Sequence, residues 1–226
     1  MKKIVVISGA NRGLGKAIAD LALQDEITFV ISLSRSWNEN EYSKKNYLFI
    51  KTDLSEPFSD KIIEKIREKL NINSIIYFFN NGAVVSPIEK TGNLGQAAIE
   101  YSLKVNIEYP VNLTDNFLKH FTGNKLVFVN ISSGAAKNST AHWAMYCSSK
   151  AYMAMFFDVL AKENRDNPDV EVYHIDPGVM DTGMQEEIRS RVFPRQDYFR
   201  KLKSDNGLAQ PSAVAARIFE QIQFRS

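Results

Sequence analysis

Short apolar runs recur along the chain, and segments with helical periodicity separate them. The first run, residues 4–7, is β-branched throughout and ends at a glycine-rich turn before a helical pattern at 16–24. Such a run is typical of a strand buried on both faces of a parallel sheet. Similar runs predict further strands at 27–33, 47–50, 74–79, 125–131 and 170–175.

Apolar residues spaced three and four apart predict the helices between these strands. The expected helices cover 58–70, 94–121, 151–162 and 211–223, and Pro110 is expected to kink the second of them. Residues 37–46 are polar and predict a loop or short helix, and 84–93 predict a loop. Residues 177–206 carry many charges and little strand pattern, so we expect a substrate-binding lid of loop and short helices.

Strands and helices alternate from end to end, with no internal repeat and no linker-like segment. This order predicts the α/β class, with a doubly wound, Rossmann-like arrangement in one domain covering residues 1–226. The expected sheet is parallel and six-stranded, with helices on both faces.

Composition narrows the functional classes. The chain has 226 residues, of which 44% are hydrophobic and 24% charged, and a net charge of +2 gives no reason to expect nucleic acid or a membrane as partner. A single cysteine excludes an internal disulfide, and the three histidines form no metal-ligand pattern. No apolar stretch approaches the roughly 20 residues of a membrane span. We therefore expect a cytoplasmic protein without a metal site.

The turn after the first strand contains three glycines, Gly9, Gly13 and Gly15, in the spacing G-x-x-x-G-x-G. Between a strand and a helix, such a turn can present backbone N–H groups to a phosphate. The alternative is a tight turn that needs only glycine's backbone freedom.

The second predicted strand ends in Ser34, Arg35 and Ser36, without an acidic residue. An acid at this point binds the ribose hydroxyl of NAD, whereas arginine accommodates the 2′-phosphate of NADP. Arg35 therefore favours NADP, with a solvated surface arginine as the alternative. Asp53, after the third strand, is either an adenine contact or a cap for the next segment.

Polar side chains also follow the later strands, where parallel sheets carry their chemistry. Asn81 follows the fourth strand, Ser133 the fifth and Gly178 the sixth. Asn106 lies between apolar residues of the long predicted helix, where a buried, hydrogen-bonded asparagine is the alternative to a functional one. Tyr146 and Lys150 are four positions apart, so a helix places both on one face. A lysine there favours the ionised phenol, whose ordinary pKa is about 10.

Taken together, these motifs resemble the short-chain dehydrogenase/reductase family in order and spacing, over nearly the whole chain. Asp181-Thr182-x-Met184-Gln185 resembles the branch with sepiapterin reductase and the bacterial benzil reductases. The resemblance implies a general acid at Tyr146, a lysine at 150 that lowers its pKa and binds the nicotinamide ribose, and a hydroxyl at Ser133 that polarises the carbonyl. It also implies that Asn106 holds a water molecule that links Lys150 to solvent, through which the proton is replaced. Substrate contacts fall on Ser133, Tyr146 and Gly178, and the implied NADP(H) contacts are Gly9, Asn11, Arg12, Gly13, Leu14, Gly15, Arg35, Asp53, Leu54, Asn81, Tyr146, Lys150, Val179, Thr182 and Met184.

Three features depart from the family pattern. The usual Asn-Asn-Ala-Gly is here Asn80-Asn81-Gly82-Ala83, so Ala83 is expected to tighten the cofactor crevice. The family's seventh strand is not expected after the last helix, so either the sheet has six strands or that strand lies outside this sequence. The acid with which sepiapterin reductase anchors its pterin has no clear counterpart, which speaks against a pterin substrate. Pocket walls are expected from 86–90, 135–143 and 179–193.

These features favour an NADPH-dependent carbonyl reductase acting on a small ketone or 1,2-dicarbonyl. The alternatives are an NAD-linked alcohol dehydrogenase and a catalytically silent NADP-sensing protein. The helix after Tyr146 is apolar nearly all round, which predicts a homo-oligomer, a dimer or tetramer, unless the helix is buried wholly within the monomer. Cys147 points to another helix face and is expected to be structural.

Overall fold

The computed structural model describes residues 2–36, 45–71 and 73–224. Most of the loop predicted at 37–46 lies outside these residues. In the described chain the sheet has six strands, all parallel, in the order β3-β2-β1-β4-β5-β6. The strands are β1 (Lys3–Ser8), β2 (Thr28–Ser34), β3 (Tyr47–Lys51), β4 (Ile75–Asn80), β5 (Lys125–Ile131) and β6 (Val170–Ile175). The predicted doubly wound α/β fold is confirmed.

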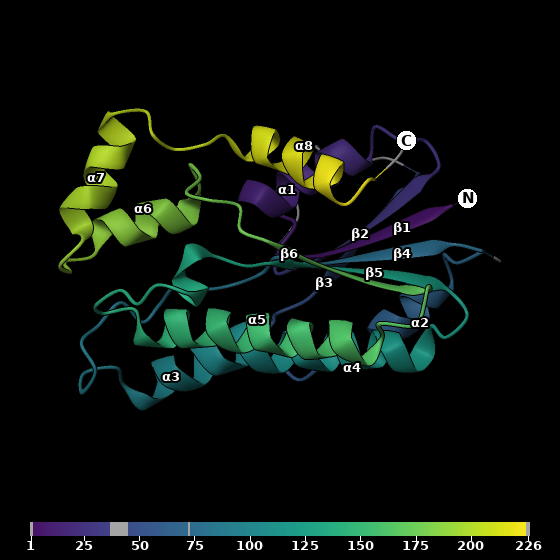
Figure 1. Cartoon of the computed structure of the whole chain (residues 1–226), viewed down its shortest axis with the longest axis horizontal. Helices are drawn as coiled ribbons and strands as arrows, with labels where there is room; N and C mark the ends of the chain where they lie inside the picture. The colour runs from purple at the N-terminus through teal and green to yellow at the C-terminus, as the bar shows by residue number, and fades with distance from the viewer. Residues whose placement is uncertain (1, 37–44, 72, 225–226) are drawn as a thin grey trace.

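Helices cover both faces of this sheet (Figure 1). On one face lie α1 (Gly13–Ala22) and α8 (Pro211–Gln221), and on the other lie α2 (Lys61–Arg67), α4 (Tyr109–His120) and α5 (Ala144–Glu163). Alternate residues of β1 serve the two faces: Val5 and Ile7 pack in the core under α1 and α8, and Ile4 and Val6 pack in the opposite core. A strand buried on both faces explains the continuous apolar run in the sequence.

The long helix predicted at 94–121 is built from three pieces. These are α3 (Gln96–Leu103), a π-helical segment η1 (Lys104–Glu108) and α4. Pro110 lies in the first turn of α4, so the irregularity falls just before the proline rather than at it. The reason is that proline has no N–H, and its ring clashes with the carbonyl four residues earlier, which belongs to Asn106. The widened turn accommodates this clash.

The helix that carries Tyr146 and Lys150 begins earlier than predicted. Its first residue is Ala144 rather than Ala151, so both side chains lie on α5 itself, one turn apart. A short 3-10 turn, η2 (Gly134–Ala136), separates β5 from this helix.

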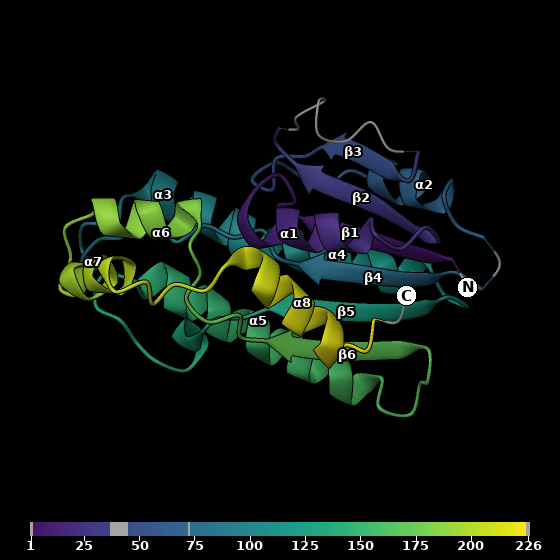
Figure 2. The same cartoon turned by 90° about the horizontal axis from the view of Figure 1, so that it is seen from above.

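The segment predicted as loop with short helices contains α6 (Gly183–Ser190) and α7 (Gln196–Ser204). Both helices lie beyond the carboxyl ends of the strands, away from the two chain ends (Figures 1 and 2). A third apolar cluster joins them to the start of α5, through Trp143, Tyr146, Ile188, Phe193 and Phe199. None of the helices in the described residues is long and apolar enough to cross a membrane.

Candidate active site

A cavity of about 650 Å³ opens at the carboxyl ends of the strands, and residues of α6 and α7 line it. It extends over the point between β1 and β4 where the strand order reverses, which is where doubly wound sheets bind ligands. Of the site residues predicted from the sequence, all but Gly15 and Asn106 line this cavity. The structure therefore brings together side chains from seven separate stretches of the chain.

The glycine turn forms one end of the cavity. Gly9 and Gly13 have positive φ angles of 71° and 56°, which explains the need for glycine at both positions. Gly15 has a different role, because a Cβ there would stand 2.2 Å from the carbonyl oxygen of Gly9. We therefore revise the prediction for Gly15: it packs the helix against the turn and does not line the cavity.

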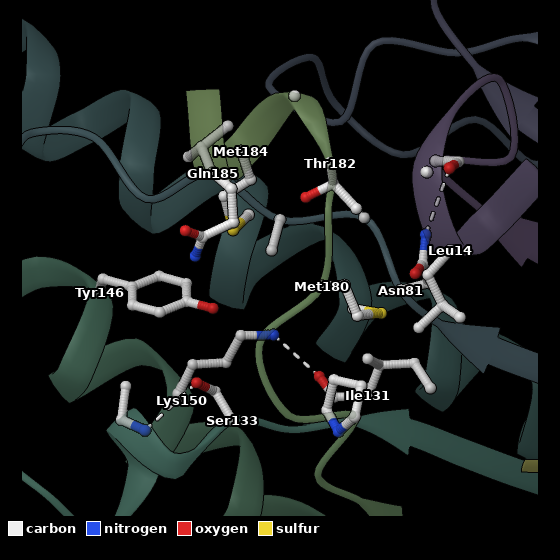
Figure 3. A pocket seen from close by; sticks show the side chains of 18 of the residues that line it. Leu14, Asn81, Ile131, Ser133, Tyr146, Lys150, Met180, Thr182, Met184 and Gln185 are labelled. Carbon is white, nitrogen blue, oxygen red and sulfur yellow. Dashed lines mark hydrogen bonds between the residues drawn. The ribbon is translucent and has the colours of Figure 1, made fainter. Parts of the chain in front are cut away.

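Asn81 locks this turn to the end of β4. Its side-chain nitrogen donates to the carbonyl oxygens of Ser8 (2.9 Å) and Gly9 (3.2 Å) (Figure 3). In return, the Ser8 hydroxyl accepts from the backbone N–H groups of Asn81 (3.0 Å) and Gly82 (2.9 Å). These bonds hold the ends of β1 and β4 in a fixed relation at the switch point of the sheet.

The exchange of alanine and glycine after Asn81 has a steric reason. A Cβ on residue 82 would stand 2.6 Å from the side chain of Leu54, and Gly82 also packs against Gly9. Ala83 lines the cavity beyond this tight contact. A Cβ at residue 82 would therefore require the end of the Leu54 side chain to shift, whereas the methyl group of Ala83 lies at the cavity wall.

The predicted adenosine end is polar and open. Arg35 and Arg12 are exposed cavity residues on neighbouring turns, and the Arg35 guanidinium donates to the hydroxyl of Tyr101 (3.3 Å). Asp53 accepts from the backbone N–H and the hydroxyl of Ser55 (2.9 and 2.8 Å), and these bonds hold the pKa of its carboxyl below the usual value. Asp53 thus lines the cavity and also stabilises its own turn, as in the capping alternative.

Tyr146, Lys150 and Ser133 meet at the other end of the cavity (Figure 3). Tyr146 and Lys150 are only 7% and 8% exposed. The Lys150 ammonium donates to the carbonyl oxygen of Ile131 (2.8 Å) and lies 5.8 Å from the centre of the Tyr146 ring. Ser133 lies two residues after the end of β5, and its hydroxyl accepts from the N–H of Ala135 (3.2 Å), which orients it at the start of η2.

Burial sets the charge states of this group. It raises the pKa of Tyr146 to about 12, and a hydrogen bond with Ser133 opposes the rise. It also lowers the pKa of Lys150 to about 8, against the field of Asp176. The net shift of the Tyr146 pKa is thus upward, opposite to the direction expected from the spacing to Lys150, because desolvation is its largest cause and the ammonium is directed at Ile131. Tyr146 is a protonated phenol at neutral pH.

Asn106 lies behind the cavity, on η1, and is 4% exposed. Its amide joins both backbone groups of Val84, accepting from the N–H (2.9 Å) and donating to the carbonyl (2.8 Å), and it also donates to the Ser149 hydroxyl (3.2 Å). The side chain is thus fully engaged in tying the loop after β4 to α5. This matches the buried-asparagine alternative for the side chain.

The walls of the cavity differ in part from those predicted. Residues 86–90 do not line it; instead Ser86 donates to the carboxylate of Glu187 on α6. Lining residues that sequence reasoning missed include Tyr101 on α3 and three residues at α7, namely Arg195, Tyr198 and Phe199. The apolar spacing of Phe193, Phe199 and Leu202 was the available signal that α7 has a face turned inward.

The comparisons with known proteins agree with this geometry. The family model described as short chain dehydrogenase matches residues 3–192. The chain belongs to the short-chain dehydrogenase family. It is 34% identical over 233 residues to a Bacillus cereus benzil reductase that forms (S)-benzoin, covering 96% of this chain and 92% of the relative. It is 26% identical over 245 residues to sepiapterin reductase of Mus musculus, covering 97% and 91%.

Solved structures extend the likeness to three dimensions. The crystal structure of the KRED1-Pglu enzyme superposes with a TM-score of 0.82 at 27% identity, covering 95% of this chain and 92% of that one. The family consists of oxidoreductases that use a nicotinamide cofactor. The residues of this chain fit such a group, because the glycine turn leaves room where side chains would stand and exposed arginines line the far end.

Proposed function

We propose that this short-chain dehydrogenase is an NADPH-dependent carbonyl reductase that acts on a small ketone or 1,2-dicarbonyl. The observation that carries the proposal is the convergence of Ser133, Tyr146 and Lys150 at one end of the cavity whose other end holds Arg35. The first three supply carbonyl chemistry, and the arginine supplies a counter-charge for a 2′-phosphate. The benzil reductases among its relatives act on a carbonyl next to a second carbonyl, which supports this substrate class.

The chain's residues have distinct tasks in this reaction. When bound, the nicotinamide supplies a hydride to the carbonyl carbon. Tyr146 gives its phenolic proton to the carbonyl oxygen, so that the product is a neutral alcohol. Ser133 donates a hydrogen bond to the same oxygen and stabilises the negative charge that develops there, in the manner of an oxyanion donor. Each oxygen lone pair is thus matched by a donor of the protein.

Lys150 supports Tyr146 in two ways. Its positive charge, near the phenol, stabilises the phenolate left after proton transfer. With a pKa of about 8, it is also able to exchange a proton near neutral pH. Asn106 holds the backbone of Val84 beside this group, and we propose that it organises the route by which the proton is replaced.

The cofactor contacts proposed from the sequence, apart from Gly15, all line the cavity. Gly9, Asn11, Gly13 and the start of α1 would hold the pyrophosphate, because a helix N-terminus favours anions. Arg35 and Arg12 would hold the 2′-phosphate, and Asp53 and Leu54 the adenine. Toward the nicotinamide, the contacts would be Asn81, Val179, Thr182 and Met184, together with Tyr146 and Lys150.

We further propose that residues 177–206 form the lid over the substrate and that the enzyme works as a homo-oligomer. The lid is attached at Ser86–Glu187 and at the bridge between Met180 and Ala209. The oligomer is supported by a stripe along α5 that stays exposed: Tyr152 (48%), Met155 (63%) and Val159 (44%). Apolar stripes of this kind mark protein contacts.

The test of the proposed function is a comparison of wild type with Tyr146→Phe. Purified wild type should oxidise NADPH in the presence of diketones, quinones or aryl ketones, with a clear preference over NADH. The phenylalanine variant should lose at least a hundredfold in kcat, since general acid catalysis contributes about 10²–10⁴. It should keep NADPH affinity within about threefold. A preference for NADH favours the alcohol dehydrogenase alternative, and NADPH binding without turnover favours the sensing protein.

A further inference from the structure

The carboxamide of Gln185 is a buried polar group whose oxygen has no partner among the described residues. Gln185 lies in the first turn of α6, is 8% exposed and lines the cavity. Its Oε1 is buried and unpaired. Figure 3 shows the carboxamide directed into the cavity on the side of the Tyr146 ring, opposite the cluster of Ser133 and Lys150.

The backbone of Gln185 is fixed, so this placement is not incidental. Its N–H donates to the carbonyl oxygen of Thr182 (2.9 Å) at the start of α6. Leaving a buried polar atom unpaired costs free energy, and a ligand that supplies the missing partner recovers it. The unpaired acceptor Oε1 therefore favours a ligand hydroxyl at that point, and Nε2 of the same carboxamide is the atom that can donate to a ligand carbonyl.

The surroundings of Gln185 are apolar and aromatic, which limits the polar contacts of a ligand. Trp143 stacks on Phe199 with ring centres 5.3 Å apart and meets Tyr146 edge-on at 5.7 Å. Ile188, one turn along α6, is buried in the same cluster. A flat apolar group fits this wall, and two of its buried atoms have no partner among the described residues: the acceptor Oε1 of Gln185 and the donor Nε1 of Trp143.

We propose that Gln185 is a specificity-determining residue that binds an oxygen on the carbon next to the reacting carbonyl. The substrate class is an aryl ketone with a vicinal oxygen, which is either a 1,2-diketone or an α-hydroxy ketone. The amide donates from Nε2 to a second carbonyl, or accepts at Oε1 from a hydroxyl. This inference rests on the proposed function, since Tyr146 and Ser133 must hold the first carbonyl.

The experiment compares two activated aryl ketones that differ in the vicinal oxygen. 1-Phenyl-1,2-propanedione has it, and 4-nitroacetophenone lacks it. The variant Gln185→Met keeps the size of the side chain and removes both polar atoms. It should lower the ratio of kcat/KM for the diketone to kcat/KM for the monoketone by at least tenfold, mainly through KM. The matched control is Gln196→Met on α7, a glutamine equally buried whose Nε2 already donates to the Arg189 carbonyl (2.9 Å).

A second variant controls for loss of the fold and distinguishes the donor role of the residue 185 side chain from its acceptor role. Gln185→Glu keeps an acceptor and loses the donor, so it should lower turnover of the diketone more than that of 2-hydroxyacetophenone. The inference is overturned if Gln185→Met lowers kcat/KM equally for the diketone and the monoketone. It is also overturned if the variant weakens NADPH binding, measured by fluorescence, by as large a factor as it lowers kcat/KM for the diketone. If wild type reduces none of the three ketones, the proposed function itself fails, which is a different result from a variant that loses them alike.

Discussion

The ammonium of Lys150 donates a hydrogen bond to the carbonyl oxygen of Ile131, the last residue of β5, at 2.8 Å. The lysine is 8% exposed, and burial lowers its pKa from 10.5 to about 8. A charged lysine is therefore held at a cost in stability, since each pKa unit corresponds to 1.36 kcal/mol and the total is about 3 kcal/mol. A buried lysine that lowers stability is consistent with the proposed role of Lys150 in proton transfer beside Tyr146, and packing alone does not explain its position.

This cost has a defined pH dependence. Between pH 8 and 10.5 the unfolded chain binds the lysine proton and the folded chain does not, so this group makes stability rise with pH in that window. We predict that Lys150→Met is more stable than wild type at pH 7, by about 1–3 kcal/mol after the lost hydrogen bond is counted. The advantage should shrink toward pH 10.5. Urea unfolding at pH 7 and pH 10 measures it, and a variant less stable at pH 7 would show that the bond to Ile131 outweighs desolvation.

Ser133 and Ser132 provide a matched pair, because both line the cavity and only the former interacts with the Tyr146 phenol. Removing one donor to a developing oxyanion costs about 10²–10³ in kcat. We predict a loss of this size for Ser133→Ala, with KM for NADPH unchanged. Ser132→Ala should remain within threefold of wild type. Steady-state kinetics decides, and equal losses in the two variants would remove Ser133 from the mechanism.

The strands were the most predictable part of the fold. β5 and β6 begin and end at the predicted residues, since runs such as Lys125–Ile131 are apolar, β-branched and bounded by polar turns. The start of α5 was missed because Tyr, Cys and Ser, which fill its first turns, are weak helix formers. Packing of Trp143 and Tyr146 against Ile188, Phe193 and Phe199 overrides that weak preference.

The candidate site was predictable as a set of residues but not as a geometry. Strand ends gave Ser133, Asn81 and the glycine turn, because parallel strands end at one edge. The hydrogen-bond partners of Asn106 could not be predicted, since Val84 and Ser149 lie 22 and 43 residues away in the sequence. Desolvation of Tyr146 likewise depends on packing with Ile188, Phe193 and Phe199, so the direction of its pKa shift could not come from the spacing to Lys150.

Arg35 carries the expected preference for NADPH. A hydrogen bond to a charged group contributes about 1.5–3 kcal/mol, so Arg35→Ala should raise KM for NADPH by about 10–100-fold. KM for NADH should stay within about twofold, since no 2′-phosphate is present. Tyr101→Phe, which removes the hydroxyl 3.3 Å from the guanidinium, is the control and should have a smaller effect. If Arg35→Ala raises KM equally for NADPH and NADH, Arg35 has a structural role in its loop and does not bind the 2′-phosphate.

Gly15 tests the distinction between packing and ligand binding. A methyl group at this position would stand 2.2 Å from the Gly9 oxygen and 2.6 Å from the Asn81 amide, so Gly15→Ala should destabilise the fold by about 3 kcal/mol or more. In Gly134→Ala the added carbon has 3.6 Å to its nearest neighbour, the carboxylate of Asp176. We predict a change within about 0.5 kcal/mol there. Thermal unfolding of the two variants, compared at one pH, provides the measurement.

The proposed oligomer can be tested by introducing one charged residue into the exposed stripe on α5. Met155 is 63% exposed between Tyr152 and Val159, and Leu103 on α3 is 41% exposed. If this stripe is a subunit interface, Met155→Lys buries an unpaired charge in it and should shift sedimentation from an oligomer toward a 25.6 kDa species at micromolar concentration. Lys162→Met, on the last turn of the same helix, is the control and should leave the oligomer intact. Wild type that sediments only as a monomer contradicts the proposal, and then the stripe is simply solvent-exposed.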